Sequence, residues 1–241
     1  MNDLPIISWE KVKVVIFDVD GTLYSQSKLR KKMLFSLLSY YAIRPWRLKD
    51  MLILQRFRSE REKRTGNPCS NLEDAQYQWC ADRGKFNVGQ VKKVVDYWMF
   101  NYPNQYLKDC MYPGTKSFFN ALQEKGKKIA VYSDYKADAK MKAMDLPTDL
   151  VVASTDPHID RLKPDPTALY YIMDKLQLMP EECLFIGDRP ELDGVCATNA
   201  KMPHLIVEKK RSNTFDFYAN LTEELNTTLN IKTYESNSYA S

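Results

Sequence analysis

The residues Asp18-Val19-Asp20-Gly21-Thr22-Leu23 decide how this chain folds. They follow the largely apolar run 12–17, in which Val, Ile and Phe dominate and which therefore predicts a buried strand stopped by a tight loop at Gly21. Open α/β sheets keep their binding sites at the carboxyl ends of the strands, so Asp18 and Asp20 are expected to reach one crevice. Two carboxylates that close repel each other unless a proton or a cation lies between them.

Three further segments follow in order along the chain. Each contains polar side chains, either at the end of an apolar run or beside prolines. A second apolar run, 128–132, ends in Ser133-Asp134. The prolines of 163–166 exclude a helix around Lys163. A third strand-like run, 183–186, ends in Gly187-Asp188, with Asp193 five positions further on.

These residue types together suit phosphoryl transfer. Asp18 can attack phosphorus and form an aspartyl-phosphate, and Asp20 can act as the acid and base. Lys163, Ser133 and the backbone N–H groups around Asp134 can neutralise the phosphoryl oxygens. Asp18, Asp188 and a backbone carbonyl near Asp20 form an all-oxygen set that suits Mg²⁺.

With these motifs the chain resembles the haloacid dehalogenase superfamily of phosphohydrolases and phosphotransferases over about residues 11–208. The family's four motifs read here as DVDGT at 18–22, Ser133, Lys163 and GDRPELD at 187–193. The resemblance implies the same roles for these residues, with Asp193 supporting the metal shell. Two positions depart from the usual pattern: Asp134 stands where many relatives have Asn, and Arg189 where many have Ser or Thr.

Each candidate also has an ordinary structural interpretation. Ser133 could simply cap the following helix, Lys163 could be one solvated lysine among many, and Asp193 could pair locally with Arg189. The order and spacing of the four motifs favour the functional interpretation for all of them.

Composition predicts a cytoplasmic enzyme with no membrane partner. The chain has 241 residues and a net charge of +4, and no apolar run approaches the length of a membrane span. Five scattered cysteines predict reduced thiols, and the two histidines lack the spacing of zinc ligands.

Between the first two motifs the pattern changes to helical spacing. The sequence predicts a small α-helical cap at 25–110, inserted into a discontinuous core of 1–24 and 111–241. Strands alternating with helices in that core predict an α/β fold with a doubly wound parallel sheet. A closing helix is expected around Phe217, Leu221 and Leu225, followed by a loose polar tail from Thr233.

The predicted cap carries most of the basic excess. Its basic residues are Lys28, Arg30, Lys31, Lys32, Arg44, Arg47, Lys49, Arg56, Arg58, Arg61, Lys63 and Arg64, against Asp50, Glu60 and Glu62. A solvated helix face is the favoured interpretation; an electrostatic funnel for an anionic substrate is the alternative, and no motif supports nucleic acid. The aromatic residues Tyr40, Tyr41, Trp46, Trp79 and Trp98 are expected in the core of the cap.

Three functions stay open at this point. The favoured one is a Mg²⁺-dependent phosphatase that acts on a small anionic phosphorylated metabolite. The others are a phosphomutase related to β-phosphoglucomutase and a non-catalytic protein that binds a partner through its basic cap. Dehalogenase and phosphonatase activities are disfavoured, because the resemblance implies that those branches lack a carboxylate at the position of Asp20. The substrate and the oligomeric state do not follow from the sequence.

Overall fold

The computed structural model describes residues 7–66, 69–208 and 215–238, with side chains through residue 229. Within these residues a parallel sheet of five strands has the order β3-β2-β1-β4-β5. The strands are β1 (Val14–Phe17), β2 (Lys128–Ser133), β3 (Leu150–Ala153), β4 (Cys183–Gly187) and β5 (His204–Ile206). β1 lies at the centre and pairs with β2 on one side and β4 on the other.

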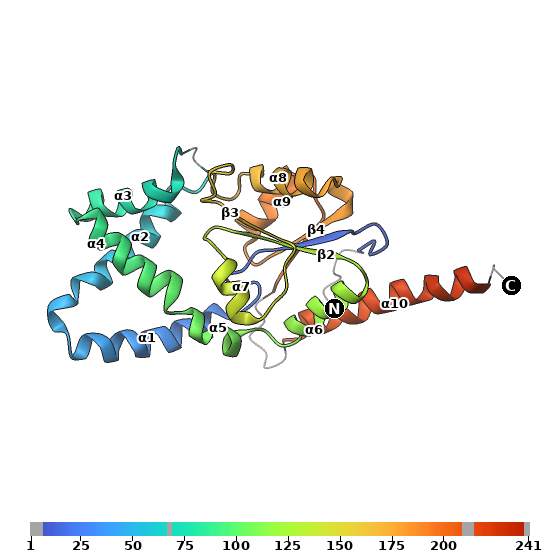
Figure 1. The fold of residues 1–241 in the computed structure, drawn as a ribbon, viewed down its shortest axis with the longest axis horizontal. Helices are drawn as coiled ribbons and strands as arrows, with labels where there is room; N and C mark the ends of the chain where they lie inside the picture. The colour runs from blue at the N-terminus through green and yellow to red at the C-terminus, as the bar shows by residue number, and fades with distance from the viewer. Residues whose placement is uncertain (1–6, 67–68, 209–214, 239–241) are drawn as a thin grey trace.

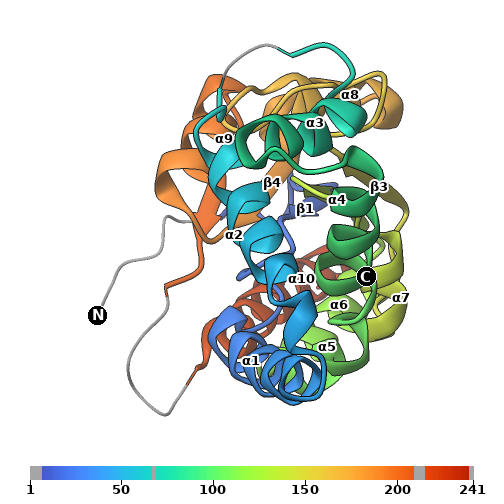
Figure 2. The same cartoon turned by 90° about the vertical axis from the view of Figure 1, so that its left-hand side faces the viewer.

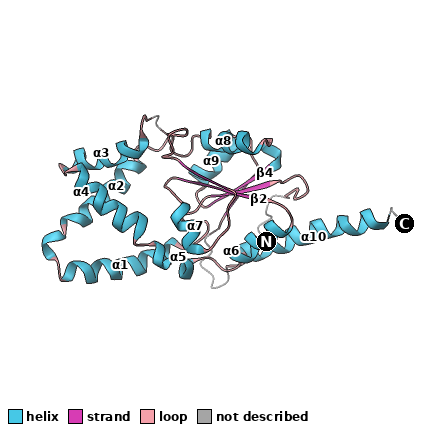
Figure 3. Cartoon of the chain, viewed as in Figure 1, coloured by secondary structure: helices cyan, strands magenta, loops and turns pink. Residues whose placement is uncertain are grey.

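The sheet is covered on both faces, as the apolar strand sequences require. Val15 and Phe17 of β1 pack with α6 (Thr115–Glu124), α7 (Asp138–Met144) and α10 (Phe217–Ser238). Val14 and Ile16 point to the other face and pack with α8 (Thr167–Leu176) and α9 (Val195–Asn199). Alternate residues of one strand thus enter two cores, which makes the sheet doubly wound, as predicted (Figures 1 and 3).

A helical insertion separates β1 from β2. It contains α1 (Gln26–Ala42), α2 (Lys49–Glu62), α3 (Leu72–Gly84), α4 (Val88–Val95) and α5 (Asn104–Cys110), with a short turn of helix at Pro45–Arg47 and a π-helical turn at Asp96–Asn101. Ile53, Phe57, Tyr77, Val95 and Trp98 form an apolar cluster within it. The insertion lies at one end of the molecule and α10 extends at the other (Figure 1). The predicted bounds of cap and core stay a prediction.

Several expectations for single segments are corrected by the structure. Trp46 is 74% exposed, so the prediction that the cap aromatics are core residues holds for Tyr41 and Trp98 but is wrong for Trp46. The tail predicted to be loose from Thr233 instead continues α10 to Ser238.

All five cysteines are free thiols, as expected. In the described part of the chain, no helix is both long and apolar enough to cross a membrane.

Candidate active site

Asp18 follows the last residue of β1 and is held by contacts from three directions. Its backbone N–H donates to the carbonyl of Ile186 at 2.9 Å and so continues the pairing with β4. Thr22 Oγ1 donates to Oδ2 at 2.8 Å, and Lys163 Nζ donates to Oδ1 at 2.7 Å. The carboxylate is therefore buried and fixed at the carboxyl end of the central strand.

Lys163 contacts residues at or after the ends of β1, β2 and β4. Its ammonium lies 2.9 Å from Asp193 Oδ1 and donates to the carbonyl of Tyr132 at 3.2 Å, in addition to Asp18. Burial disfavours the charged form of Lys163, but the carboxylates of Asp18 and Asp193 outweigh it and hold the lysine pKa well above its usual range. The ammonium is thus a permanent positive charge beside Asp18.

Asp193 shapes the loop that carries Asp188. Its Oδ2 accepts hydrogen bonds from the backbone N–H groups of Asp188 and Arg189, both at 3.0 Å. This approach needs Gly187, because a Cβ there would lie 2.3 Å from the Cβ of Asp193. Asp193 therefore positions Asp188 and Lys163, and its Oδ2 is already occupied by two backbone hydrogen bonds.

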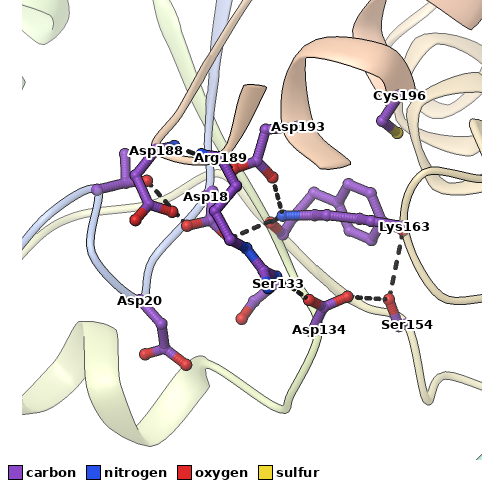
Figure 4. A network of polar contacts seen from close by, with 12 residues as sticks. Asp18, Asp20, Ser133, Asp134, Ser154, Lys163, Asp188, Arg189, Asp193 and Cys196 are labelled. Carbon is purple, nitrogen blue, oxygen red and sulfur yellow. Dashed lines mark hydrogen bonds and ion pairs between the residues drawn. The ribbon is translucent and has the colours of Figure 1, made fainter. Parts of the chain in front are cut away.

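Three carboxylates meet at this point: oxygens of Asp18, Asp188 and Asp193 all lie within 4.8 Å of one another, and all three residues are buried (Figure 4). Burial raises the pKa of Asp18 to about 7; Lys163 opposes the shift, and the charges of Asp193 and Asp188 add to it. Asp193 keeps its charge because Lys163 and two backbone N–H groups offset its burial. A set of hard oxygen donors with excess negative charge fits a divalent cation such as Mg²⁺.

Asp20 lies apart from this cluster, and its side chain is directed toward α7 (Figure 4). Lys140 Nζ donates to its Oδ1 and Oδ2 at 2.5 and 2.6 Å, and the Tyr24 hydroxyl donates to Oδ1. Burial favours the neutral acid, yet Lys140 outweighs it and lowers the pKa of Asp20. The backbone carbonyl of Asp20, which the sequence proposes as a metal ligand, accepts a hydrogen bond from Gln26 Nε2 at 2.6 Å.

The two positions that depart from the family pattern contact each other. Arg189 Nη2 lies 2.9 Å from Asp134 Oδ2 in an ion pair. Ser133 is buried beside them, and its Oγ accepts a weak hydrogen bond from the backbone of Tyr135 at 3.4 Å. The extra negative charge of Asp134 is therefore compensated by the extra positive charge of Arg189.

The insertion reaches this same loop through Arg61 of α2. Arg61 is buried, its Nη2 donates to the carbonyl of Asp134 at 2.6 Å, and its guanidinium lies 4.1 Å from the ring centre of Tyr135. Gln76 of α3 accepts a further hydrogen bond from Arg61. One side chain thus ties two helices of the insertion to the end of β2.

The structure brings together most of the residues that the sequence selected. Asp18, Lys163, Asp188 and Asp193 share one cluster, Ser133 and Asp134 border it, and Asp20 lies to one side. Lys140 and Tyr24 were missed, and Arg61 was selected only as one of the basic residues of the predicted cap. Tyr24 follows Asp20 by four residues, which is a usable signal, whereas Lys140 and Arg61 depend on how distant segments pack.

The comparison with family models decides the identity of the fold. Residues 12–200 match the model of the haloacid dehalogenase-like hydrolases. The chain belongs to this family.

Solved structures of haloacid dehalogenase-like proteins share the fold at low sequence identity. The chain is similar to a HAD phosphatase from Thermococcus onnurineus, with 20% identity, coverage of 85% of this chain and 90% of the other, and a TM-score of 0.57. It is also similar to a 2-haloacid dehalogenase from Pseudomonas syringae pv. Tomato, with 16% identity, coverage of 84% of this chain and 90% of the other, and a TM-score of 0.56. A third similar structure is a β-phosphoglucomutase from Clostridium difficile, with 16% identity, coverage of 90% of this chain and 99% of the other, and a TM-score of 0.55. No curated protein matches the sequence.

These neighbours have different activities, so the likeness establishes only the fold of this hydrolase. The reaction depends on the side chains that the fold carries, not on the fold itself.

Proposed function

We propose that this haloacid dehalogenase-like hydrolase is a Mg²⁺-dependent phosphatase that acts on a small phosphorylated metabolite through an aspartyl-phosphate on Asp18. The observation that carries the proposal is the Asp18–Lys163 pair, buried beside Asp188, with a second carboxylate, Asp20, two residues further on. A displacement of halide needs no proton donor for its leaving group, whereas an alkoxide leaving group does. The presence of Asp20 therefore favours phosphate ester hydrolysis.

In this proposal Asp18 is the nucleophile. Oδ1 is bound by Lys163 and Oδ2 by Thr22, so the carboxylate has a fixed direction before it attacks phosphorus. Lys163 also supplies positive charge near the oxygens of the transferring group, and Ser133 offers its hydroxyl at the end of the neighbouring strand.

Asp18 and Asp188 would hold Mg²⁺, with Asp193 positioning Asp188 rather than serving as a main ligand, because its Oδ2 already binds two backbone N–H groups. Bound Mg²⁺ would neutralise charge on the phosphoryl oxygens. A contribution from the Asp20 carbonyl would require Gln26 to give up its hydrogen bond.

Asp20 is the acid and base in this proposal, and it starts from an ion pair with Lys140. To protonate a leaving oxygen it must take up a proton and leave Lys140. Lys140 of the core and Arg61 of the insertion both lie within 6 Å of the Tyr135 ring. We expect a substrate that enters between the insertion and the core to separate Lys140 from Asp20.

The test is a screen of phosphorylated metabolites with Mg²⁺, measuring released phosphate. The proposal expects turnover of at least one phosphomonoester, loss of turnover in Asp18→Asn, and normal turnover in Asp145→Asn, an exposed carboxylate that pairs with Lys116. Transfer between two sugar hydroxyls without phosphate release would instead indicate a mutase. A complete absence of turnover would favour the non-catalytic alternative.

A further inference from the structure

The outer face of the insertion has an unusual composition for a solvent-exposed surface. In α1 the exposed residues Leu34, Phe35 and Leu38 lie on one side of the helix, while Met33, Leu37 and Tyr40 pack inward on the apolar cluster. Phe35 is 74% exposed. A surface helix normally has one apolar face and one polar face, and a helix that is apolar on both sides needs a second partner.

The same exposure continues through the turn into α2. Ile43, Trp46 and Leu48 lie in the turn and Met51 and Leu52 at the start of α2, all exposed, with Trp46 as accessible as Phe35. Figure 2 shows α1 and α2 together at the end of the molecule that faces the viewer. We call these residues the apolar face: Leu34, Phe35, Leu38, Ile43, Trp46, Leu48, Met51 and Leu52.

The segment that carries this face also carries an excess of positive charge, of which Lys32 is paired with Asp109 of α5. Residues 26–58 contain nine Lys or Arg and a single acidic residue, Asp50. Asp50 is buried, and its carboxylate lies 3.1 Å from Arg47 Nε. A solvated helix face, the favoured interpretation of the basic residues from sequence, does not explain large apolar side chains between them.

A cavity of about 430 Å³ adjoins the apolar face at Leu52. Its lining includes Lys49, Arg56 and Lys85, and it contains no carboxylate among the residues that line it. Arg56 donates a long hydrogen bond of 3.4 Å to the carbonyl of Arg83, and its guanidinium lies 5.3 Å from the ring centre of Phe86. Three cations around one hollow beside apolar side chains suit a phosphate headgroup whose acyl chains lie against the protein.

We propose that the apolar face and this basic cavity bind the surface of an anionic phospholipid bilayer. Aromatic and aliphatic side chains enter the boundary between headgroups and acyl chains, and surrounding Lys and Arg residues attract the negative surface. Neither feature is a membrane span, and the proposal departs from the expectation that the chain has no membrane partner. That expectation rests on the lack of a long apolar run, which contact with a membrane surface does not require.

Two other occupants fit the face less well. In a two-fold dimer the same patch meets itself, which would bring basic residues of one copy, such as Lys49 and Arg56, close to those of the other. Nucleic acid would account for the charge but leave Leu34, Phe35, Leu38 and Ile43 without a role.

The test is co-sedimentation with vesicles of phosphatidylcholine alone and of equal parts phosphatidylcholine and phosphatidylglycerol. The proposal expects binding to the mixed vesicles at low salt and little binding to phosphatidylcholine alone. Trp46 emission should shift to the blue on binding, because the other tryptophans are already buried or half-buried. Trp46→Phe should remove that shift while the protein still sediments.

Variants separate the two parts of the site. Phe35→Ser with Leu38→Ser, and separately Lys49→Glu with Arg56→Glu, should each weaken binding by about tenfold or more. Matched controls are Met179→Ser, an exposed apolar residue of the core, and Lys175→Glu, an exposed lysine of α8; both should bind normally.

Three outcomes would overturn the proposal. One is no binding to mixed vesicles. Another is a dimer in light scattering that Phe35→Ser with Leu38→Ser converts to a monomer, which would assign the face to a second copy. The third is a combination of two results. DNA binding is lost in Lys49→Glu with Arg56→Glu but kept in Phe35→Ser with Leu38→Ser, and the latter variant also binds vesicles normally.

Discussion

Asp20 lies in surroundings that favour its ionised form, although its proposed role begins with the donation of a proton. Lys140 contacts both of its oxygens, and Tyr24 donates to one of them. Burial alone would raise the pKa of Asp20, but Lys140 and Tyr24 outweigh burial and lower it. In the proposed mechanism Lys140 therefore controls when Asp20 can act as an acid.

This contact predicts a change in pH dependence for Lys140→Met. Without the ammonium, burial dominates and the pKa of Asp20 rises, so the fall of kcat/KM that follows deprotonation of the acid should move to higher pH. The measurement is kcat/KM against pH on a phosphate ester with a poor leaving group. Lys140→Arg should resemble the wild type, as should Lys142→Met, an exposed lysine of the same helix. Identical profiles for Lys140→Met and the wild type would contradict this role.

A second prediction concerns Asp134 and Arg189, whose charges compensate each other beside the proposed phosphate site. Asp134→Asn leaves the guanidinium without its carboxylate, and Arg189→Ser leaves the carboxylate near an anionic substrate. Each single variant should lower kcat/KM, and the double variant should recover part of the loss, with a coupling of about 1 kcal/mol. Strict additivity of the two effects in a double-mutant cycle would show that the pair acts independently.

Among the elements of the insertion, α2 is the one whose side chain Arg61 contacts the carbonyl that follows β2. Arg61 makes that connection through the Asp134 carbonyl, Gln76 and Tyr135. It belongs to the basic residues that the sequence assigns to a solvated face or a substrate funnel, and the structure corrects this for Arg61, which is buried.

We expect Arg61→Met to loosen the insertion. Loss of the guanidinium leaves the Asp134 carbonyl and the buried side-chain oxygen of Gln76 without this donor. The amides of α2 and α3 should therefore exchange their hydrogens faster, and kcat/KM should fall. Hydrogen exchange measured by mass spectrometry tests this, with Arg58→Met, an exposed arginine of the same helix, as the control. Unchanged exchange in α2 and α3 would show that Arg61 does not fasten the insertion.

The sequence predicts elements well where pattern and motif coincide. The strands before Asp18, Ser133 and Asp188 are apolar runs stopped by polar residues, and each is present. β3, Leu150–Ala153, was not predicted, because four residues without a following motif carry little periodic signal. The exposure of Trp46 was missed for a related reason, since helical spacing alone does not say whether one or both faces of a helix are covered.

The same limit applies to the candidate site. Local order in the sequence predicts that Asp18, Lys163 and Asp188 converge, because parallel strands end at one edge. The Lys140–Asp20 and Arg61–Asp134 contacts join residues 120 and 73 positions apart and depend on helix packing that no motif records.

For the molecule as a whole, the proposed binding of Mg²⁺ by Asp18 would link metal binding to stability. Folding raises the pKa of Asp18 from 3.8 to about 7, so its contribution to stability is present at low pH and is lost as the pH rises through that interval. Mg²⁺ binds the ionised carboxylate and should reverse this loss. The gain in melting temperature with Mg²⁺ should therefore be larger at pH 8 than at pH 5.5, and Asp188→Asn should reduce it. An equal gain at both pH values would exclude Asp18 as a ligand.

The central claim is that Asp18 becomes phosphorylated during turnover. The direct measurement is to quench the enzyme in acid during turnover of a substrate found in the metabolite screen, and to locate the added mass by peptide mass spectrometry. The account predicts one phosphoryl group on the peptide that contains Asp18, with none in Asp18→Asn and more in Asp20→Asn if that variant slows hydrolysis of the intermediate. Active turnover with no phosphoryl group on that peptide, or normal turnover by Asp18→Asn, would contradict it.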